Sequence, residues 1–250
     1  MASRYQRHLS LPGFTPRHQE RLDAAHVLVV GAGGLGAPVL TYLAGAGVGE
    51  LTVMDDDQID ETNLQRQVLF TVADIGRPKA VVAAERVQAL NPDITVHPLT
   101  TRFSPTTQSQ MSDDLNLVVD CSDNLPTRYL LESWALNADV PYVWAAIGQY
   151  AGRCSVVLPH VGACFECVYG PAERVAEWPN GAQGGVFGPV CGVVGALAAA
   201  EAIKVLTGLG QPLVGRMAMV DAWSGDLTQI VIHPDPYCRT CQDRHLTDLA

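Results

Sequence analysis

The chain has 250 residues, 48% of them hydrophobic, and a formal net charge of −10 at pH 7. This is enough apolar material for a large α/β domain with a buried core that needs no disulfides. Only 16 Lys and Arg residues are spread over an acidic chain, so the composition excludes a general affinity for nucleic acid, and any anion site must be local.

The N-terminal stretch "MASRYQRHLSLPGF" contains no apolar signal region. The most apolar stretch, residues 186–205, is interrupted by glycine, proline and a Glu–Lys pair. We therefore expect no membrane association and a cytoplasmic protein. The seven cysteines include two CxxC pairs and leave one thiol over from pairing, which indicates a metal site in a reducing compartment.

In chain order, β-rich runs alternate with helical patterns over the first 147 residues. We expect strands over Val27–Gly31, Glu50–Asp55, Thr95–Leu99, Leu117–Cys121 and Tyr142–Ala146, with helices over Leu35–Ala46, Lys79–Leu90 and Asn124–Ala138. This alternation is typical of a doubly wound, mainly parallel, Rossmann-like α/β sheet.

From Gly148 the pattern changes. The stretches 148–159, 215–223 and 226–234 indicate antiparallel strands, and a helix is expected over Val193–Leu206. We expect these strands to extend the first sheet within a single domain over residues 1–250. Its parts are an N-terminal helical arm (1–24), a nucleotide-binding half (25–147) and a second half (148–250).

A glycine loop joins the first strand to the first long helix in "VLVVGAGGLGAPVLT", residues 27–41. A GxGxxG match alone is weak, but here a strand precedes it, a helix follows it, and Asp55 lies nineteen residues beyond Gly36. This arrangement predicts nucleotide phosphates at the helix N-terminus, with Asp55 accepting hydrogen bonds from the ribose hydroxyls. Tight packing without a nucleotide is the alternative.

Polar residues after Asp55 distinguish ATP from NAD. Arg66 and Lys79 follow the acid, with Asn63 close by. Hydride transfer has no use for two such cations, whereas a triphosphate attacked at its α-phosphorus does, because negative charge accumulates on its oxygens. The alternatives are a solvated surface pair, an NAD-dependent Rossmann oxidoreductase, and a nucleotide-binding scaffold without catalysis.

Asp123 follows the apolar run "LNLVVDC" and precedes a helix, which puts it at the carboxyl edge of the sheet, where α/β ligands bind. Helix capping by Asp123 or Ser122 is the alternative.

Four of the cysteines form two pairs, Cys164-x-x-Cys167 and Cys238-x-x-Cys241, about seventy residues apart. Two such pairs supply the four thiolates of a closed, structural Zn²⁺ site. A redox CxxC pair is the alternative. The other three cysteines lie in apolar runs and are expected to act as small buried hydrophobes: Cys121, Cys154 and Cys191.

The glycine loop, "NLQRQ", "RPKA", "DCSDN", "GPVCGVVGALAAAEAIKVLTG" and the two CxxC pairs, in this order over nearly the whole chain, resemble the MoeB/ThiF family. The resemblance implies an enzyme that binds MgATP and adenylates the C-terminal glycine carboxylate of a ubiquitin-like sulfur carrier (ThiS- or MoaD-like), releasing pyrophosphate. It also implies the residue roles. Gly34 would approach the phosphates, Asp55 hold the ribose, Arg66 and Lys79 bind the triphosphate, and Asp123 help to hold Mg²⁺. Asn63 and Asn124 are expected to bind the nucleotide as well, and Arg66, Lys79 and Asp123 are the catalytic residues of this chain's own site.

The resemblance further implies a homodimer in which Arg7 of "RYQRH" reaches the partner's site. The carrier, ending in Gly-Gly, would bind the second half through apolar groove residues such as Phe187 and Trp144. The alternative is that both are core aromatics, which is the commoner role. Some family members link the carrier to a cysteine at the position that is Gly181 here, so no catalytic cysteine is assigned, and Cys191 is a weak candidate. Sulfur is expected from a separate donor protein, and the pathway, thiamine, molybdopterin or a related one, is left open.

Overall fold

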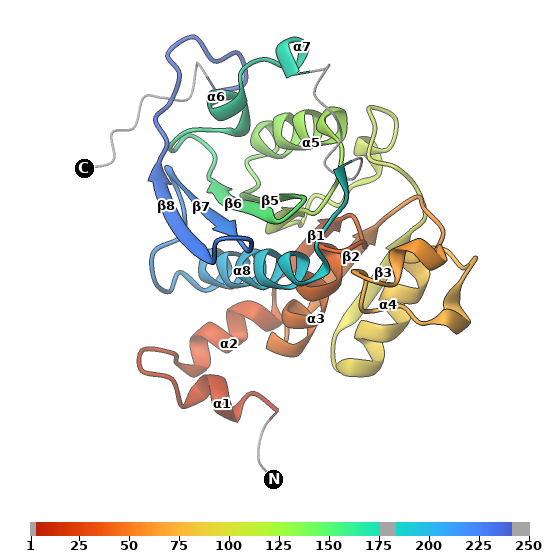
Figure 1. Cartoon of the computed structure of the whole chain (residues 1–250). Coiled ribbons are helices and arrows are strands. Elements are labelled where there is room, and N and C mark those ends of the chain that lie inside the picture. Colours follow the sequence, from red (N-terminus) through yellow and green to blue (C-terminus); the bar gives the residue numbers. More distant parts are fainter. Residues whose placement is uncertain (1–3, 176–183, 242–250) are drawn as a thin grey trace.

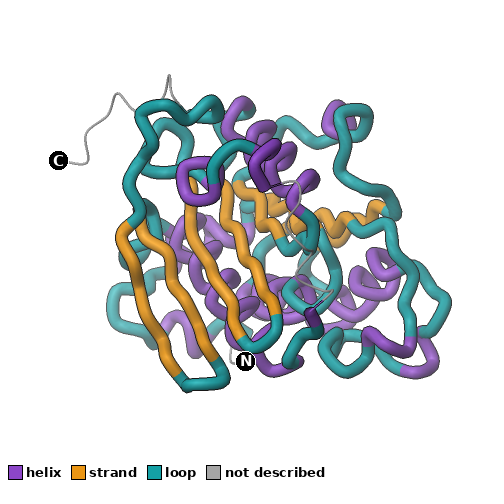
Figure 2. Tube along the Cα trace, turned by 45° about the horizontal axis from the view of Figure 1, so that its top comes forward, coloured by secondary structure: helices purple, strands orange, loops and turns teal. Residues whose placement is uncertain are grey.

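The computed structural model describes residues 4–175 and 184–241 (Figures 1 and 2). Its centre is one sheet with the strand order β3-β2-β1-β4-β5-β6-β7-β8. The bounds are β1 His26–Val30, β2 Glu50–Met54, β3 Thr95–Leu99, β4 Leu117–Asp120, β5 Tyr142–Gly148, β6 Ala151–Val157, β7 Arg216–Asp221 and β8 Asp226–Val231. The first five strands pair in parallel, and β6, β7 and β8 add antiparallel. The predicted doubly wound sheet with an antiparallel extension is confirmed.

Helices cover both faces of the sheet (Figure 1). One face carries α3, α4 and α8, and the other carries α5 and α6. The bounds are α1 Gln6–Leu9, α2 Pro16–Asp23, α3 Gly36–Ala46, α4 Lys79–Leu90, α5 Leu125–Asn137, α6 Phe165–Tyr169, α7 Ala172–Val175 and α8 Gly188–Thr207, with 3₁₀ turns η1 Glu61–Asn63, η2 Val72–Asp74 and η3 Gln108–Gln110. Because it is covered on both sides, β1 is buried at all five positions.

Two predicted helix boundaries were wrong. α8 begins at Gly188, five residues before the predicted start, because Pro189 in the first turn lacks the N–H that a helix start leaves unbonded anyway. α5 begins at Leu125, and Asn124 is its N-cap rather than its first residue.

α8 also differs from the expectation that no stretch is apolar enough to cross a membrane. Among the described residues, α8 is a helix long and apolar enough to cross a membrane, judged by length and composition alone, with a mean hydropathy of 1.8. Half of its apolar window is buried inside the molecule, where α8 packs on α3, β5 and β6. This burial accounts for its apolar composition.

Asp74 at the end of η2 joins this turn to α4. It is buried and accepts hydrogen bonds from the backbone N–H and the hydroxyl of Thr71, at 2.9 and 2.7 Å, and from Arg86 at 2.8 Å. The Thr71 hydroxyl, followed by the Arg86 guanidinium, holds the pKa of Asp74 well below its usual value of 3.8.

An Asp74→Asn variant is expected to be less stable than the wild type at neutral pH. A lowered carboxyl pKa contributes stability that is present above the unfolded value and is lost as the pH falls through the folded value. The difference in unfolding free energy should therefore be full above about pH 4 and should narrow as the pH falls further. Urea unfolding at several pH values measures it, and a difference that does not change with pH would contradict this role.

Candidate active site and cysteine cluster

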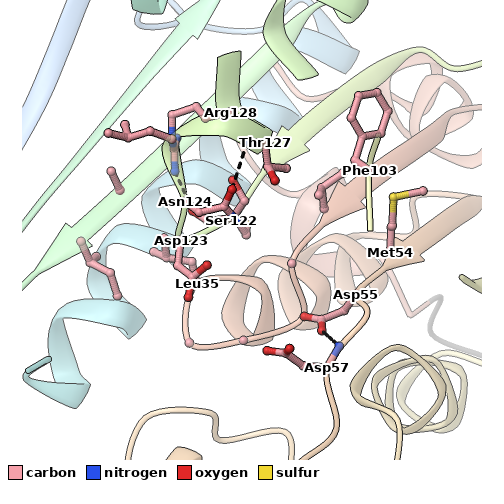
Figure 3. Close-up of a pocket in the computed structure, with 18 of the residues that line it drawn as sticks. Leu35, Met54, Asp55, Asp57, Phe103, Ser122, Asp123, Asn124, Thr127 and Arg128 are labelled. Atoms are coloured by element: carbon pink, nitrogen blue, oxygen red, sulfur yellow. Dashed lines mark hydrogen bonds between the residues drawn. The ribbon is translucent and has the colours of Figure 1, made fainter. Parts of the chain in front are cut away.

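A cavity of about 410 Å³ lies at the carboxyl ends of β1, β2, β4 and β5 (Figure 3). The strand order reverses between β1 and β4, and such a switch point is where open α/β sheets bind ligands. The glycine loop after β1 forms one wall, and the turn after β4 forms another.

The glycine loop makes a tight turn in which the backbone leaves no room for a Cβ atom at two positions, so glycine is required at both. Gly31 has φ +95°, and a Cβ on it would lie 2.7 Å from the carbonyl oxygen of Cys121. A Cβ on Gly36 would lie 2.0 Å from the carbonyl oxygen of Gly31. The loop therefore brings backbone N–H groups and the start of α3 to the cavity, which favours an anionic ligand there.

Asp55 lies at the end of β2 and lines the cavity. Its carboxylate accepts hydrogen bonds from the backbone N–H groups of Ala32, at 2.7 Å, and Asp57, at 2.9 Å. Burial raises the pKa of Asp55 above its usual value, and the two backbone hydrogen bonds and Lys79 oppose that shift. The carboxylate thus ties the glycine loop to β2, and its oxygens retain capacity for ribose hydroxyls.

Both predicted cations line the cavity rather than facing bulk solvent. Lys79, the first residue of α4, is only 5% exposed and places its Nζ 2.8 Å from Asp57. Arg66 is half-buried and donates to the carbonyl oxygen of Thr62 at 3.1 Å. Asn63, the third predicted residue here, accepts from the backbone N–H of Asp60 at 3.3 Å and is not among the lining residues.

The turn after β4 presents Asp123 and Asn124 to the cavity (Figure 3). Asp123 is exposed at the cavity wall. The side chain of Asn124 accepts a hydrogen bond from the backbone N–H of Thr127 at 3.0 Å. The cap of α5 is therefore Asn124, and the alternative role for Asp123 or Ser122 as its cap was wrong.

Among the lining residues that the sequence reasoning missed, three share one feature: Gln67, Ser122 and Arg128. Each is buried and has a side-chain atom without a hydrogen-bond partner within the described part of the chain: Gln67 Oε1, Ser122 Oγ and Arg128 Nη1. Arg128 also lies 3.3 Å from Asp120 and donates to the carbonyl oxygens of Ser122 and Ala145. Buried polar atoms without a hydrogen-bond partner, here Gln67 Oε1 and Ser122 Oγ, indicate a site built for a polar ligand, whereas Arg128 Nη1 already forms an ion pair with Asp120.

Arg7 does not line the cavity. It is exposed on α1, and the neighbouring Tyr5 packs against Gly47 at the far end of α3. The eleven residues of α3 span about 16 Å, and its near end, Gly36, is the end that meets the glycine loop. Arg7 therefore lies too far away to act on the cavity of its own chain.

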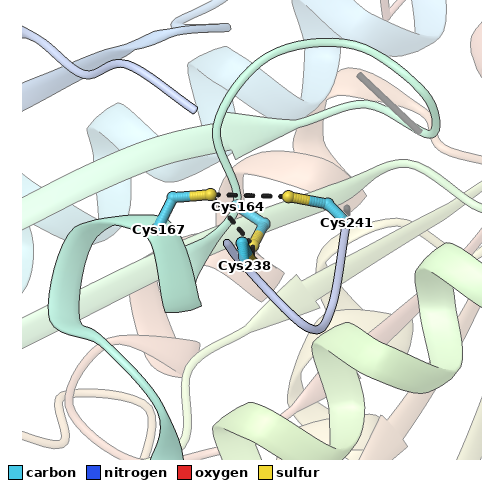
Figure 4. A group of neighbouring side chains, drawn as sticks. All are labelled: Cys164, Cys167, Cys238 and Cys241. Carbon is cyan, nitrogen blue, oxygen red and sulfur yellow. Dashed lines mark hydrogen bonds between the residues drawn. The ribbon is translucent and has the colours of Figure 1, made fainter. Parts of the chain in front are cut away.

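The four CxxC cysteines form a compact cluster (Figure 4). The sulfurs of Cys164 and Cys238, and those of Cys167 and Cys241, are 3.4 Å apart, and those of Cys164 and Cys167 are 3.7 Å apart. Tetrahedral Zn–S bonds of about 2.3 Å require sulfurs about 3.8 Å apart, so this donor set fits zinc. The cluster joins α6 to the segment that follows β8.

The structure bears differently on the predictions for four residues of the second half: Cys191, Gly181, Trp144 and Phe187. Cys191 is buried in the first turn of α8, and burial raises its pKa. Gly181 lies outside the described residues. Trp144 is fully buried, so its predicted place in a carrier groove was wrong, whereas Phe187 is 45% exposed. Trp144 is a core residue because it packs on Phe165 and Tyr169.

The fold and the cavity together define a Rossmann-like α/β protein with a nucleotide-type anion site. A family model described as "ThiF family" matches residues 5–240. The chain therefore belongs to the ThiF family, as the resemblance implied.

The chain is similar in sequence to several curated proteins. It is 42% identical to "Sulfur carrier protein adenylyltransferase" of Thermus thermophilus, over 96% of this chain and 90% of that protein. It is 40% identical to "SAMP-activating enzyme E1" of Haloferax volcanii, over 95% and 88%. It is 41% identical to "Probable adenylyltransferase/sulfurtransferase MoeZ" of Mycobacterium tuberculosis, over 94% and 61%. Among solved structures, that of E. coli MccB with ATP has a TM-score of 0.84 at 25% identity, over 96% of this chain and 75% of that one.

Proposed function

We propose that this chain is a nucleotidyltransferase that uses ATP to adenylate the C-terminal carboxylate of a small sulfur carrier protein and releases pyrophosphate. The observation that carries the proposal is the place of Lys79 and Arg66 on the cavity wall, beside the glycine loop and the ribose acid Asp55. The names of the relatives, a sulfur carrier adenylyltransferase among them, support the same activity.

The chemistry asks little of the protein beyond position and charge. A carboxylate is already an anion at pH 7, so its attack on the α-phosphorus needs no general base. Negative charge grows on the phosphate oxygens, where Lys79, Arg66 and the loop N–H groups would stabilise it. Asp55 would orient the ribose, and Gly34 lets the backbone approach the phosphates.

Two metals belong to this proposal. The carboxylate of Asp123, exposed at the cavity wall, is an oxygen ligand of the type that Mg²⁺ takes beside substrate phosphates. The four thiolates suit Zn²⁺ with every position occupied by protein, so that zinc would stabilise the fold and take no part in the reaction. Asn124 would support Asp123 by capping the helix that follows it.

We propose a homodimer in which Arg7 completes the site of the partner. Arg7→Ala and Lys79→Ala variants should each be nearly inactive as homodimers, because each lacks one cation at both sites. After the two variants are mixed and exchanged, mixed dimers keep one intact site, and activity should return to about a quarter of the wild-type value. Pyrophosphate exchange measures it, and a mixture as inactive as its components would contradict a shared site.

One assay separates this function from the two alternatives. The protein is incubated with ATP, Mg²⁺, labelled pyrophosphate and a carrier that ends in Gly-Gly. Label entering ATP only when the carrier is present supports adenylation. NADH formation in a parallel mixture would support an oxidoreductase, and nucleotide binding without exchange would support a scaffold.

We also propose that the protein acts in the cytoplasm and receives sulfur from a separate donor. The chain covers 90% of a relative named only for adenylyl transfer, but 61% of one also named as a sulfurtransferase. Adenylyl transfer is part of both names, which supports adenylation as the step that the chain performs. The choice between thiamine, molybdopterin and related pathways depends on the carrier.

A further inference from the structure

The cavity is electrically uneven along its length. Its β2 end is acidic, with Asp55, Asp56 and Asp57 on the wall, and Asp123 lies at its middle. At the β6 end the described lining residues include no carboxylate, the cation on β6 is Arg153, and most of the wall beside it is apolar, with Ala146, Ile147, Gly152 and the ring of Tyr169.

Three other cations of the cavity wall form ion pairs, whereas Arg66, like Arg153, forms none with the described residues. Lys79 pairs with Asp57, Arg102 with Asp56 and Arg128 with Asp120.

Arg153 is half-buried and forms no ion pair with the described residues. Its Nη1 donates to the Tyr169 hydroxyl at 3.0 Å, and its guanidinium lies 6.0 Å from the centre of that ring. The side chain is therefore held in place while its charge stays available to a ligand.

Strand register gives the position of Arg153 relative to the phosphate loop. Val30 and Trp144 both pair with Asp120, and Arg153 pairs with Ala146, two residues beyond Trp144 on β5. Arg153 thus lies just above the strand ends, three strand spacings, about 14 Å, from β1, which carries the phosphate loop. An extended peptide advances about 3.3 Å per residue, so about four residues span this distance, and about three bring a tail residue within reach of the Arg153 side chain, which extends from β6 to the cavity wall.

We infer that Arg153 selects the charge of the carrier tail at the residue that precedes its two terminal glycines. This inference rests on the proposed function. With the terminal carboxylate at the phosphate loop, the tail runs toward β6, and the two glycines offer no side chain. The third residue from the end is then the first whose side chain can meet the guanidinium, where a carboxylate is favoured and an ammonium is repelled.

The test reverses the charge of Arg153 and, separately, the charge of one residue of the carrier tail. Two carriers are prepared that differ only in Glu or Lys at the third residue from the end. The wild type should show a KM in pyrophosphate exchange about 10-fold lower for the Glu tail, with kcat little changed. Arg153→Gln should remove the preference, and Arg153→Glu should reverse it. Arg17→Glu, on the exposed face of α2, makes the same change in net charge and should leave the preference intact.

A binding measurement keeps the two proposals apart. Fluorescence anisotropy of labelled carriers, without ATP, should give Kd values with the same order of preference. Equal KM and Kd values for the two tails on the wild type would overturn the inference even if exchange proceeds. A charge preference in Kd without any exchange would uphold it and overturn adenylation. If Arg153→Glu does not fold, the comparison of the two tails on the wild type and on Arg153→Gln decides the matter.

Discussion

Replacing Lys79 with alanine is expected to lower the rate of carrier-dependent ATP–pyrophosphate exchange about 100-fold to 1,000-fold. Lys79 is held at the cavity wall, only 5% exposed, where an ammonium acts on phosphate charge with little screening by water. The loss should appear mainly in kcat, because negative charge on the α-phosphate oxygens is greatest in the transition state.

The fold should survive this change. The partner of Lys79 is Asp57, whose side chain is 62% exposed, so water can solvate the carboxylate once the ammonium is gone. The matched control is Arg77→Ala, two residues earlier, whose guanidinium pairs with Glu85 and with Asp74 and lies outside the cavity. That variant should keep its exchange rate within about 2-fold. Equal rates for the two variants would remove Lys79 from the reaction.

Replacing Cys238 with serine is expected to reduce the zinc content from about one per chain to under about 0.1. The same change should lower Tm by about 10 °C or more. The cluster links α6 to the segment after β8, and losing one thiolate opens a closed tetrahedral site. Metal analysis of the purified protein and thermal unfolding measure the two effects.

The control for the cysteine cluster is Cys154→Ala. Cys154 is fully buried on β6 and lies outside the cluster. The Cys154→Ala variant should retain its zinc, and its Tm should fall only by the few degrees that a small core truncation costs. A Cys238→Ser protein with a full complement of zinc and an unchanged Tm would contradict a structural zinc site.

The sheet was predictable because its signals are local. The central parallel strands β1, β2 and β4 are buried at almost every position and appear as largely apolar runs, and Gly31 and Gly36 mark the turn where backbone atoms approach closely. The placement of Asp55 and Asp123 followed from the same rule, since both come directly after strands whose carboxyl ends share one edge.

The residues that were missed depend on contacts between distant segments. Arg128 belongs to the site because its guanidinium reaches Asp120 and the carbonyl oxygen of Ala145, a contact that no spacing in the sequence reveals. Gln67 stands next to Arg66, yet only its burial beside Gly33 marks it. The sequence could not decide the place of Trp144 either, because an aromatic ring suits a binding groove and a core equally well.

Arg7 shows a further limit of sequence reasoning. A motif can place an arginine in the N-terminal arm, but only the fold shows that α1 lies at the far end of α3 from the cavity. A role for Arg7 in the partner's site depends on how two chains assemble, and the structure of one chain does not determine it.

The most direct test of the mechanism follows the oxygen atoms of the carrier. A carrier whose terminal carboxylate contains ¹⁸O is adenylated, and the product is cleaved with hydroxylamine at its acyl carbon. Attack of the carboxylate on the α-phosphorus makes one of its oxygens the bridge to AMP, so mass spectrometry should find one ¹⁸O in AMP and none in pyrophosphate. Label in orthophosphate together with ADP, or unlabelled AMP, would contradict the account.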